Sequence, residues 1–254
     1  LEGVPANTTV ECDAVPAPAT VTASDDFSSN LQVDFDESTE DADCGYVITR
    51  TWSTADACGN PVTASQVITV VDTTNPTISA AGDNATIACP AEPVFTAPTA
   101  EDNCDENVMV MLVSDETTPG ACEGTYTRTK TWKAVDNCGN ESNTVSQTIT
   151  VVDETAPVLN GTPAATLTVT SESMIPSAAT VTAVDACDSN VPVEYNQEIE
   201  YNDCGYVINR TWTAADDCGN DVDFVQTINV VDESAPVLEG VPANTTVECD
   251  AVPA

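Results

Sequence analysis

Short runs in which apolar and polar residues alternate recur along this chain. In residues 66–72, Ile68 and Val70 fall on one face and Thr69 falls on the other, and residues 147–153 repeat the pattern. A period of two is typical of a β-strand with one buried face. Threonine and valine abound while leucine, lysine and glutamine are scarce, which favours strand over helix. The pattern therefore predicts a chain built of strands.

A second alternating run ends in tryptophan. Tyr46, Ile48, Arg50 and Trp52 share one face of the strand predicted over residues 46–52. A strand inside a sandwich buries a large aromatic side chain, and an arginine on the same face covers that side chain or pairs with an acid. We therefore expect Trp52 in the core rather than on a sugar-binding surface.

The sequence around this tryptophan recurs at a fixed interval. Trp52, Trp132 and Trp212 lie 80 residues apart, and Asp-x-Cys-Gly-Asn, Gln-x-Ile-x-Val-Val-Asp and a proline linker follow each of them. A fixed period marks a repeat protein. The first 17 residues also reappear letter for letter as the last 17, so we expect the chain to be a window from a longer array. The linkers predict three units, at 1–76, 77–157 and 158–236, and the first strand of a fourth at 237–254.

The turn sequences suggest how each unit folds. Cys-Gly-Asn between two alternating runs supplies the glycine and asparagine that a tight hairpin prefers. Seven or so short strands in about 80 residues, ending in a hairpin, are typical of an immunoglobulin-like sandwich. The predicted fold class is all-β, with tandem immunoglobulin-like β-sandwiches arranged in single file.

Composition removes several classes of function. The net charge is -37 with only five lysines and arginines, so nucleic acid is excluded as a partner because binding to the phosphate backbone requires cationic side chains. No histidine is present, which removes the usual general base and the commonest zinc ligand. No apolar run approaches the about 18 residues of a membrane span. A net charge this negative makes the chain repel itself, and bound divalent cations or high external salt would offset that repulsion.

Several strings resemble a known group. TRTWSTADACGN, TVSQTITVVDETAPVL and VPANTTVECDAVP resemble the hyalin-repeat-like, immunoglobulin-type modules of very large surface adhesins of gliding and other outer-membrane bacteria. The resemblance covers the whole chain and is most specific at Asp-x-Cys-Gly-Asn and Val-Val-Asp-x-x-x-Pro. It implies a secreted, stalk-forming array on the bacterial cell surface, without identifying a ligand. Only the second unit carries four cysteines, which departs from a uniform pattern.

The cysteines occupy four recurrent positions, and strand direction predicts how they pair. Cysteines at strand ends that share one pole of a unit lie close enough to form a disulfide. A zinc site is disfavoured, because the four positions lie at opposite poles and lack Cys-x-x-Cys spacing. The predicted disulfides are Cys12–Cys44, Cys89–Cys122, Cys104–Cys138 and Cys187–Cys218. Cys58 and Cys204 are left over, and Cys249 is the duplicate of Cys12 in the repeated 17 residues. We expect either a bridge between Cys204 and the counterpart of Cys58 in the next unit, or two free, buried thiols. Disulfides imply an oxidising, extracellular setting.

Carboxylates gather at the pole where the units meet. Three or more carboxylates beside asparagine and backbone carbonyls make a plausible calcium site, because calcium takes six to eight oxygen ligands. The candidate ligands are ten aspartates: Asp25, Asp56, Asp72, Asp102, Asp105, Asp136, Asp153, Asp185, Asp188 and Asp216. The alternative is that Asp56, Asp136 and Asp216 cap their hairpin turns while the others are solvated loop residues.

These observations predict a non-enzymatic segment of a stalk or filament. Its partners would be neighbouring repeats of the same chain, with lateral self-association of chains as a further possibility. The alternative is a module that binds glycan or protein through the loops at one pole. An enzyme is the weakest option, because every candidate carboxylate pair recurs at a turn or linker position.

Overall fold

The structure is a computed structural model that describes residues 1–27, 31–240, 243–244 and 246–247. Within these residues the chain forms β-strands and two short 3-10 turns, Cys12–Ala14 and Glu172–Met174, and no α-helix. It divides into two compact bodies, Leu1–Asp153 and Glu154–Ala254. The predicted start of a fourth unit, 237–254, falls largely outside the described residues.

The first unit is built around one sheet of four strands. These strands lie in the order β1-β4-β3-β2, with β1 parallel to β4 and the other pairs antiparallel. Their bounds are β1 (Thr8–Glu11), β2 (Asp34–Ala42), β3 (Gly45–Ala55) and β4 (Pro61–Val71). A single bridge between Glu2 and Thr22 stands where the other units have a second, two-stranded sheet.

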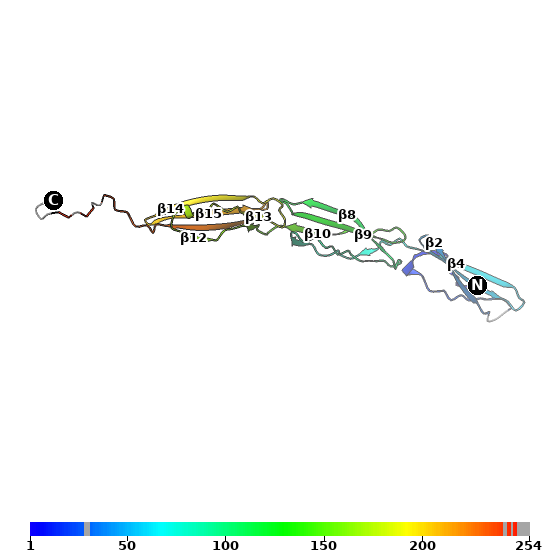
Figure 1. Ribbon diagram of the computed structural model, residues 1–254. Coiled ribbons are helices and arrows are strands. Elements are labelled where there is room, and N and C mark those ends of the chain that lie inside the picture. Colours follow the sequence, from blue (N-terminus) through cyan, green and yellow to red (C-terminus); the bar gives the residue numbers. More distant parts are fainter. Residues whose placement is uncertain (28–30, 241–242, 245, 248–254) are drawn as a thin grey trace. The chain divides into compact units, whose positions relative to one another are not determined.

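The second unit repeats this sheet as β6-β10-β9-β8 and adds the pair β5-β7. Figure 1 shows β8, β9 and β10 side by side within it. The strands are β5 (Thr77–Ile78), β6 (Ala85–Ala88), β7 (Ala100–Glu101), β8 (Met109–Pro119), β9 (Tyr126–Val135) and β10 (Val145–Val152). A register shift between Leu112 and Ser114 interrupts the pairing of β8 with β9.

The third unit has the sheet β12-β16-β15-β14 and the pair β11-β13. Its strands are β11 (Val158–Asn160), β12 (Thr166–Val169), β13 (Thr182–Val184), β14 (Val193–Asn202), β15 (Gly205–Ala215) and β16 (Asp221–Val231). The all-β, immunoglobulin-like prediction is therefore confirmed. Between four and six strands per unit are found in the described residues, fewer than the seven expected, because several connecting segments run without regular pairing.

Each core lies on the face that alternation predicts. Ile48, Ile68 and Val70 form a buried cluster in the first unit. Trp52 is only 2% exposed and packs on Phe35, with ring centroids 5.5 Å apart. The prediction that the tryptophan is core rather than surface is confirmed.

A buried glutamine holds the parallel first strand in place. In the first unit, the side-chain amide of Gln66 donates to the carbonyl of Ala6 at 2.9 Å, and the side chain of Asn7 accepts from the amide of Val67 at 2.8 Å. Gln147 and Asn84 make the same pair of contacts in the second unit. These bonds pin the start of each first strand beside the last strand, so that both strands end at the same pole.

Candidate functional site at a disulfide-linked joint

Two loops of the second unit form what we call its entry face: residues 102–105, after β7, and residues 136–140, after β9. Asp102 Oδ1 accepts from the amides of Cys104 and Asp105, at 2.7 and 3.1 Å. Asp105 then accepts from the amide of Asn137 at 2.9 Å, which ties the two loops together. The entry face is therefore fixed by hydrogen bonds from carboxylates to the backbone.

Asp136 organises the hairpin turn of this face. It accepts from the amides of Cys138 and Asn140 at 2.8 Å each, and from the side-chain amide of Asn140 at 2.9 Å. Asp56 and Asp216 make the corresponding bonds with Asn60 and Asn220. All three aspartates therefore cap their hairpin turns, which was the alternative to metal binding at these positions.

Hydrogen bonding also lowers the pKa of two of these caps. For Asp56 the main cause is the side-chain hydrogen bond from Asn60. For Asp216 burial acts in the opposite direction, but the hydrogen bonds from Asn220 and the turn backbone outweigh it, so the pKa is lowered overall. Both carboxylates are therefore held in the ionised form.

The first unit ends in an exit face formed by Cys12, Cys44 and Asp72, where β1 and β4 finish together. Cys12 directly follows β1, and Cys44 directly precedes Gly45 at the start of β3. Gly45 has φ +120° and pairs with Val71, and a Cβ there would collide with the carbonyl of Val70. Glycine is therefore required to bring Cys44 beside the end of β4.

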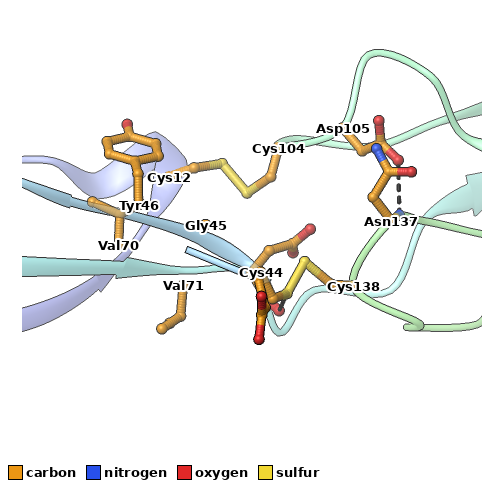
Figure 2. Close-up of a pocket in the computed structure, with 12 residues that line it drawn as sticks. Cys12, Cys44, Gly45, Tyr46, Val70, Val71, Cys104, Asp105, Asn137 and Cys138 are labelled. Carbon is orange, nitrogen blue, oxygen red and sulfur yellow. Dashed lines mark hydrogen bonds between the residues drawn. A yellow bond between two sulfur atoms is a disulfide. The ribbon is translucent and has the colours of Figure 1, made fainter. Parts of the chain in front are cut away.

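Two disulfides join the exit face of the first unit to the entry face of the second. Cys12 is bonded to Cys104 with a Cα–Cα distance of 5.6 Å, and Cys44 to Cys138 with 5.1 Å. Figure 2 shows both bridges crossing the joint. The predicted pairs Cys12–Cys44 and Cys104–Cys138 are wrong. Strand direction placed each cysteine at the correct pole, but the argument treated a unit as closed, and each sulfur bonds across the joint instead.

Four further cysteines are also disulfide-bonded: Cys89, Cys122, Cys187 and Cys218. The pairings expected for them, Cys89–Cys122 and Cys187–Cys218, came from the argument that failed at the joint, and they stay predictions. Cys58 and Cys204 are free thiols, and both are exposed rather than buried. All eight cysteines predicted to form disulfides within units are oxidised, which is typical of an extracellular setting.

Asp72 lies buried at the joint among other carboxylates. It is 7% exposed, and a carboxylate oxygen of Asp72 lies within 4.8 Å of one from Asp136 and of one from Glu11. Burial raises the pKa of Asp72, and the charges of Asp102, Asp136 and Glu11 raise it further. One oxygen of Asp102 is buried without a hydrogen-bond partner among the described residues. The joint thus concentrates negative charge where water is scarce.

The structure separates the predicted metal ligands by role. Asp72, Asp102 and Asp136 come together at the joint, as expected. Asp105, Asp185 and Asp188 bond to backbone amides of their own loops, and Asp25 accepts from the amide of Phe27. Asp153 is 8% exposed at the end of the first body. Metal binding by the ten aspartates stays a prediction.

The sequence argument missed two residues at the joint. Glu11 accepts from the amide and hydroxyl of Thr73 at 3.2 and 2.6 Å, which anchors the linker to the end of β1. The side-chain amide of Asn140 donates to the carbonyl of Asp72 at 3.3 Å. The position of Glu11 directly before Cys12 was the available signal.

A cleft of about 240 Å³ remains between the two bridges, lined in part by Tyr46, Val70 and Asn137.

Comparison with known families bears on the second unit. Residues 77–151 match the family described as HYR-like domain with 4 cysteines. The matched stretch contains Cys89, Cys104, Cys122 and Cys138. The unit is therefore similar to an extracellular repeat domain, which supports a structural or adhesion role. The search of curated proteins found no match to the chain.

Solved structures give distant matches. The human Desmocollin-1 ectodomain is 11% identical with a TM-score of 0.31, and the match covers 91% of this chain and 61% of that one. Human CDH23 EC21-23 is 18% identical with a TM-score of 0.31, covering 72% and 73%. The Protocadherin gammaB7 EC3-6 cis-dimer is 13% identical with a TM-score of 0.32, covering 92% and 76%. In the described part of the chain, no helix has the length and apolar character needed to cross a membrane.

Proposed function

We propose that this chain is a non-enzymatic segment of the stalk of a large bacterial surface adhesin, and that its main partners are the neighbouring units of the same chain. The observation that carries the proposal is the pair of disulfides between the first two units. Two covalent links at different points of one joint resist both separation and swivelling, whereas a linker alone permits both. A stalk needs this property because it transmits tension.

The bridges also shorten the path along which the joint can be stretched. Between Cys12 and Cys138, the shortest covalent path runs through the chain to Cys44 and across its disulfide. That path contains about 30 residues and extends to about 110 Å, against about 125 residues and about 430 Å in the reduced chain. When unfolded, the oxidised joint therefore extends to only about a quarter of the length that the reduced joint reaches.

Pulling on the full chain by its termini tests the proposal. A variant with serine at Cys12, Cys44, Cys104 and Cys138 should extend about 200 Å further than the wild-type chain when fully unfolded, with the predicted Cys89–Cys122 bridge kept in both. A matched C58S/C204S variant should extend like the wild type, because those thiols are free. Equal extension of the four-serine variant and the wild type would contradict the role in tension.

Calcium at the joint is the second part of the proposal. Asp72 is buried beside Asp102, Asp136 and Glu11, and these carboxylates raise its pKa, so a divalent cation would remove an unfavourable repulsion. Carboxylates with the carbonyl and amide oxygens of the linker suit a hard cation. The carboxylates of the joint are thus the type of ligand that calcium takes.

Thermal melting with and without calcium tests this part. We expect calcium to raise the melting temperature of the wild-type chain and a chelator to reverse the effect. D72N should lose the calcium-dependent rise, whereas D36N, at an exposed aspartate of β2 that is not a candidate ligand, should keep it. A wild-type melt that is the same in calcium and in chelator would contradict calcium binding and leave the disulfide argument intact.

The alternative, that the loops at one pole bind glycan or protein, is less favoured at this joint. The entry loops of the second unit are bonded to the first unit through Cys104 and Cys138, and Asn140 contacts the linker. A ligand would have to displace a covalent contact. Glycan-array binding by the intact chain would favour the alternative.

A further inference from the structure

The thiols that are free in the described residues, Cys58 and Cys204, occupy positions equivalent to those of the bonded pair Cys138 and Cys44. Cys58 follows Asp56 as Cys138 follows Asp136, and in both turns the cysteine amide donates to the aspartate Oδ1 at 2.8 Å. The next residues, Gly59 and Gly139, both have φ +86°. Cys58 is therefore displayed on the entry face of the first unit as Cys138 is displayed on that of the second.

Cys204 matches Cys44 in the same way. Each directly precedes a glycine with positive φ, +120° for Gly45 and +144° for Gly205. Gly45 pairs with Val71 and Gly205 with Val231, and in both cases an added Cβ would collide with the carbonyl of the preceding valine. Cys204 is thus an exit-face cysteine, exposed and unbonded.

We propose that the exit face of the third unit binds the entry face of a first unit in another copy of this segment, and that Cys204 and Cys58 form the disulfide across that joint. The inference uses the stalk proposal only for its setting, since it rests on the equivalence with Cys44–Cys138. The first unit displays an entry-face cysteine and the third unit an exit-face cysteine, and both thiols are free.

The missing second bridge supports this assignment. Val10 and Val169 occupy the same register against the last strand, so Ser171 stands where Cys12 stands. On the entry face, the amide of Phe27 donates to Asp25 at 3.0 Å, as that of Cys104 donates to Asp102 at 2.7 Å. One bridge is therefore absent on both sides of the same joint. Because Ser171 and Phe27 replace both cysteines of this second bridge, neither face carries an unpaired thiol at that position.

Phe27 gives the joint an apolar contact in place of that bridge. Its side chain is 98% exposed, at the position from which Cys104 reaches the preceding unit. Met174, three residues beyond Ser171 and 58% exposed, offers an apolar side chain on the exit face. Covering these groups removes apolar area from water, which favours a partner that carries the matching face.

The bond forms by thiol–disulfide exchange. One thiolate attacks a small-molecule disulfide such as oxidised glutathione and releases one glutathione thiolate, and the second cysteine then displaces the other. Two thiols lose two protons and two electrons, and the oxidised glutathione is reduced. Asp56 on one face and Asp203 on the other leave both thiols in acidic surroundings, so repulsion slows the approach and added salt should speed it.

The test uses variants of the full chain in glutathione buffer. Every variant also carries C249S, because Cys249 lies outside the described residues. In this background, C58S retains Cys204 as its unbonded thiol, and C204S retains Cys58. An equimolar mixture should form a disulfide-linked dimer several-fold faster than either variant alone, and peptide mapping of the dimer should show a Cys58–Cys204 link. Chains with C249S as their one substitution should form a ladder of oligomers that a reductant converts to monomers.

A third variant separates face recognition from simple thiol reactivity. F27A placed in the C204S background should slow formation of the mixed dimer, yet leave the reaction of Cys58 with a small maleimide unchanged. Dimers that form as fast in each variant alone as in the mixture would overturn the proposal, as would an absence of any dimer in the mixture. Neither result would affect the force measurement on the joint between the first two units.

Discussion

Cys44 and Cys138 lie 94 positions apart in sequence and in different units, yet their Cα atoms are 5.1 Å apart and their sulfurs are bonded. The Cys12–Cys104 bridge crosses the same joint. The first unit therefore supplies one face of this joint and the second unit supplies the other, and neither contains its own disulfide partners there. The structural element that the cysteines define is the joint between two units.

Cutting the linker should leave the first two units attached. With a protease site inserted at Thr74, cleavage of the oxidised chain should give one band on a non-reducing gel and two bands after reduction. Pairing within units would instead release two fragments without reductant. A C12S/C44S variant is the matched control, since it lacks both exit-face cysteines and should separate on cleavage under all conditions.

Much of the fold follows from local patterns. Alternation at Ile68 and Val70 predicts a strand with one buried face, and both side chains are at most 1% exposed. The hairpin between β3 and β4 follows from the Asp-x-Cys-Gly-Asn motif. Such features depend on residues close in sequence, and that is why a single sequence reveals them.

The disulfide partners could not be predicted in the same way. Strand direction gives the pole at which Cys12 and Cys44 lie, but two sulfurs at one pole can bond to each other or to a neighbouring unit. The choice depends on how the linker at Asp72 places the next unit, and that depends on contacts such as Glu11 with Thr73. The buried cluster around Asp72 follows from the same placement.

The charge of Asp72 should destabilise the joint near neutral pH when no metal is present. Its folded pKa lies above the ordinary value of 3.8, chiefly because it is buried, so the folded chain binds this proton more tightly than the unfolded chain. The penalty is present above the folded pKa and disappears as the pH falls through it. In chelator, D72N should therefore melt at a higher temperature than the wild type at pH 7.

A pH series distinguishes this cause from a simple packing effect. The advantage of D72N should shrink as the pH falls through the folded pKa of Asp72, because the carboxylate is then protonated in the folded chain. In calcium the order should reverse, with D72N melting lower. An advantage that is the same at every pH would show that the charge is not responsible.

The cap at Asp216 should protect its turn, most strongly when the carboxylate is ionised. Its pKa is lowered overall despite burial, so the stabilisation is present above the ordinary value of 3.8 and is lost as the pH falls through the folded pKa. D216A removes the acceptor for two hydrogen bonds from Asn220, both 2.8 Å. Amide exchange at Asn220 should rise on the order of tenfold, because each net bond contributes about 1 kcal/mol. D216N, which keeps an acceptor oxygen, should show a smaller rise.

A buried arginine has a different side-chain partner in the first and third units, so the two partners can be exchanged by mutation. Arg50 is 3% exposed and forms an ion pair with Glu37 at 2.7 Å. Arg210, at the same register and 5% exposed, bonds to Gln197 at 3.0 Å and has no ion-pair partner in the described part of the chain.

The reciprocal substitutions should therefore have opposite effects. E37Q should destabilise the first unit and Q197E should stabilise the third, each by about 1 kcal/mol, since Glu37 is 37% exposed and solvent weakens the ion pair. Arg210 also donates to the carbonyl of Pro176 at 2.9 Å, which keeps its side chain in place for the new carboxylate. Amide exchange in β3 for E37Q and in β15 for Q197E measures each unit within the full chain. Faster exchange in β15 of Q197E would mean that desolvating the added carboxylate costs more than the new ion pair contributes.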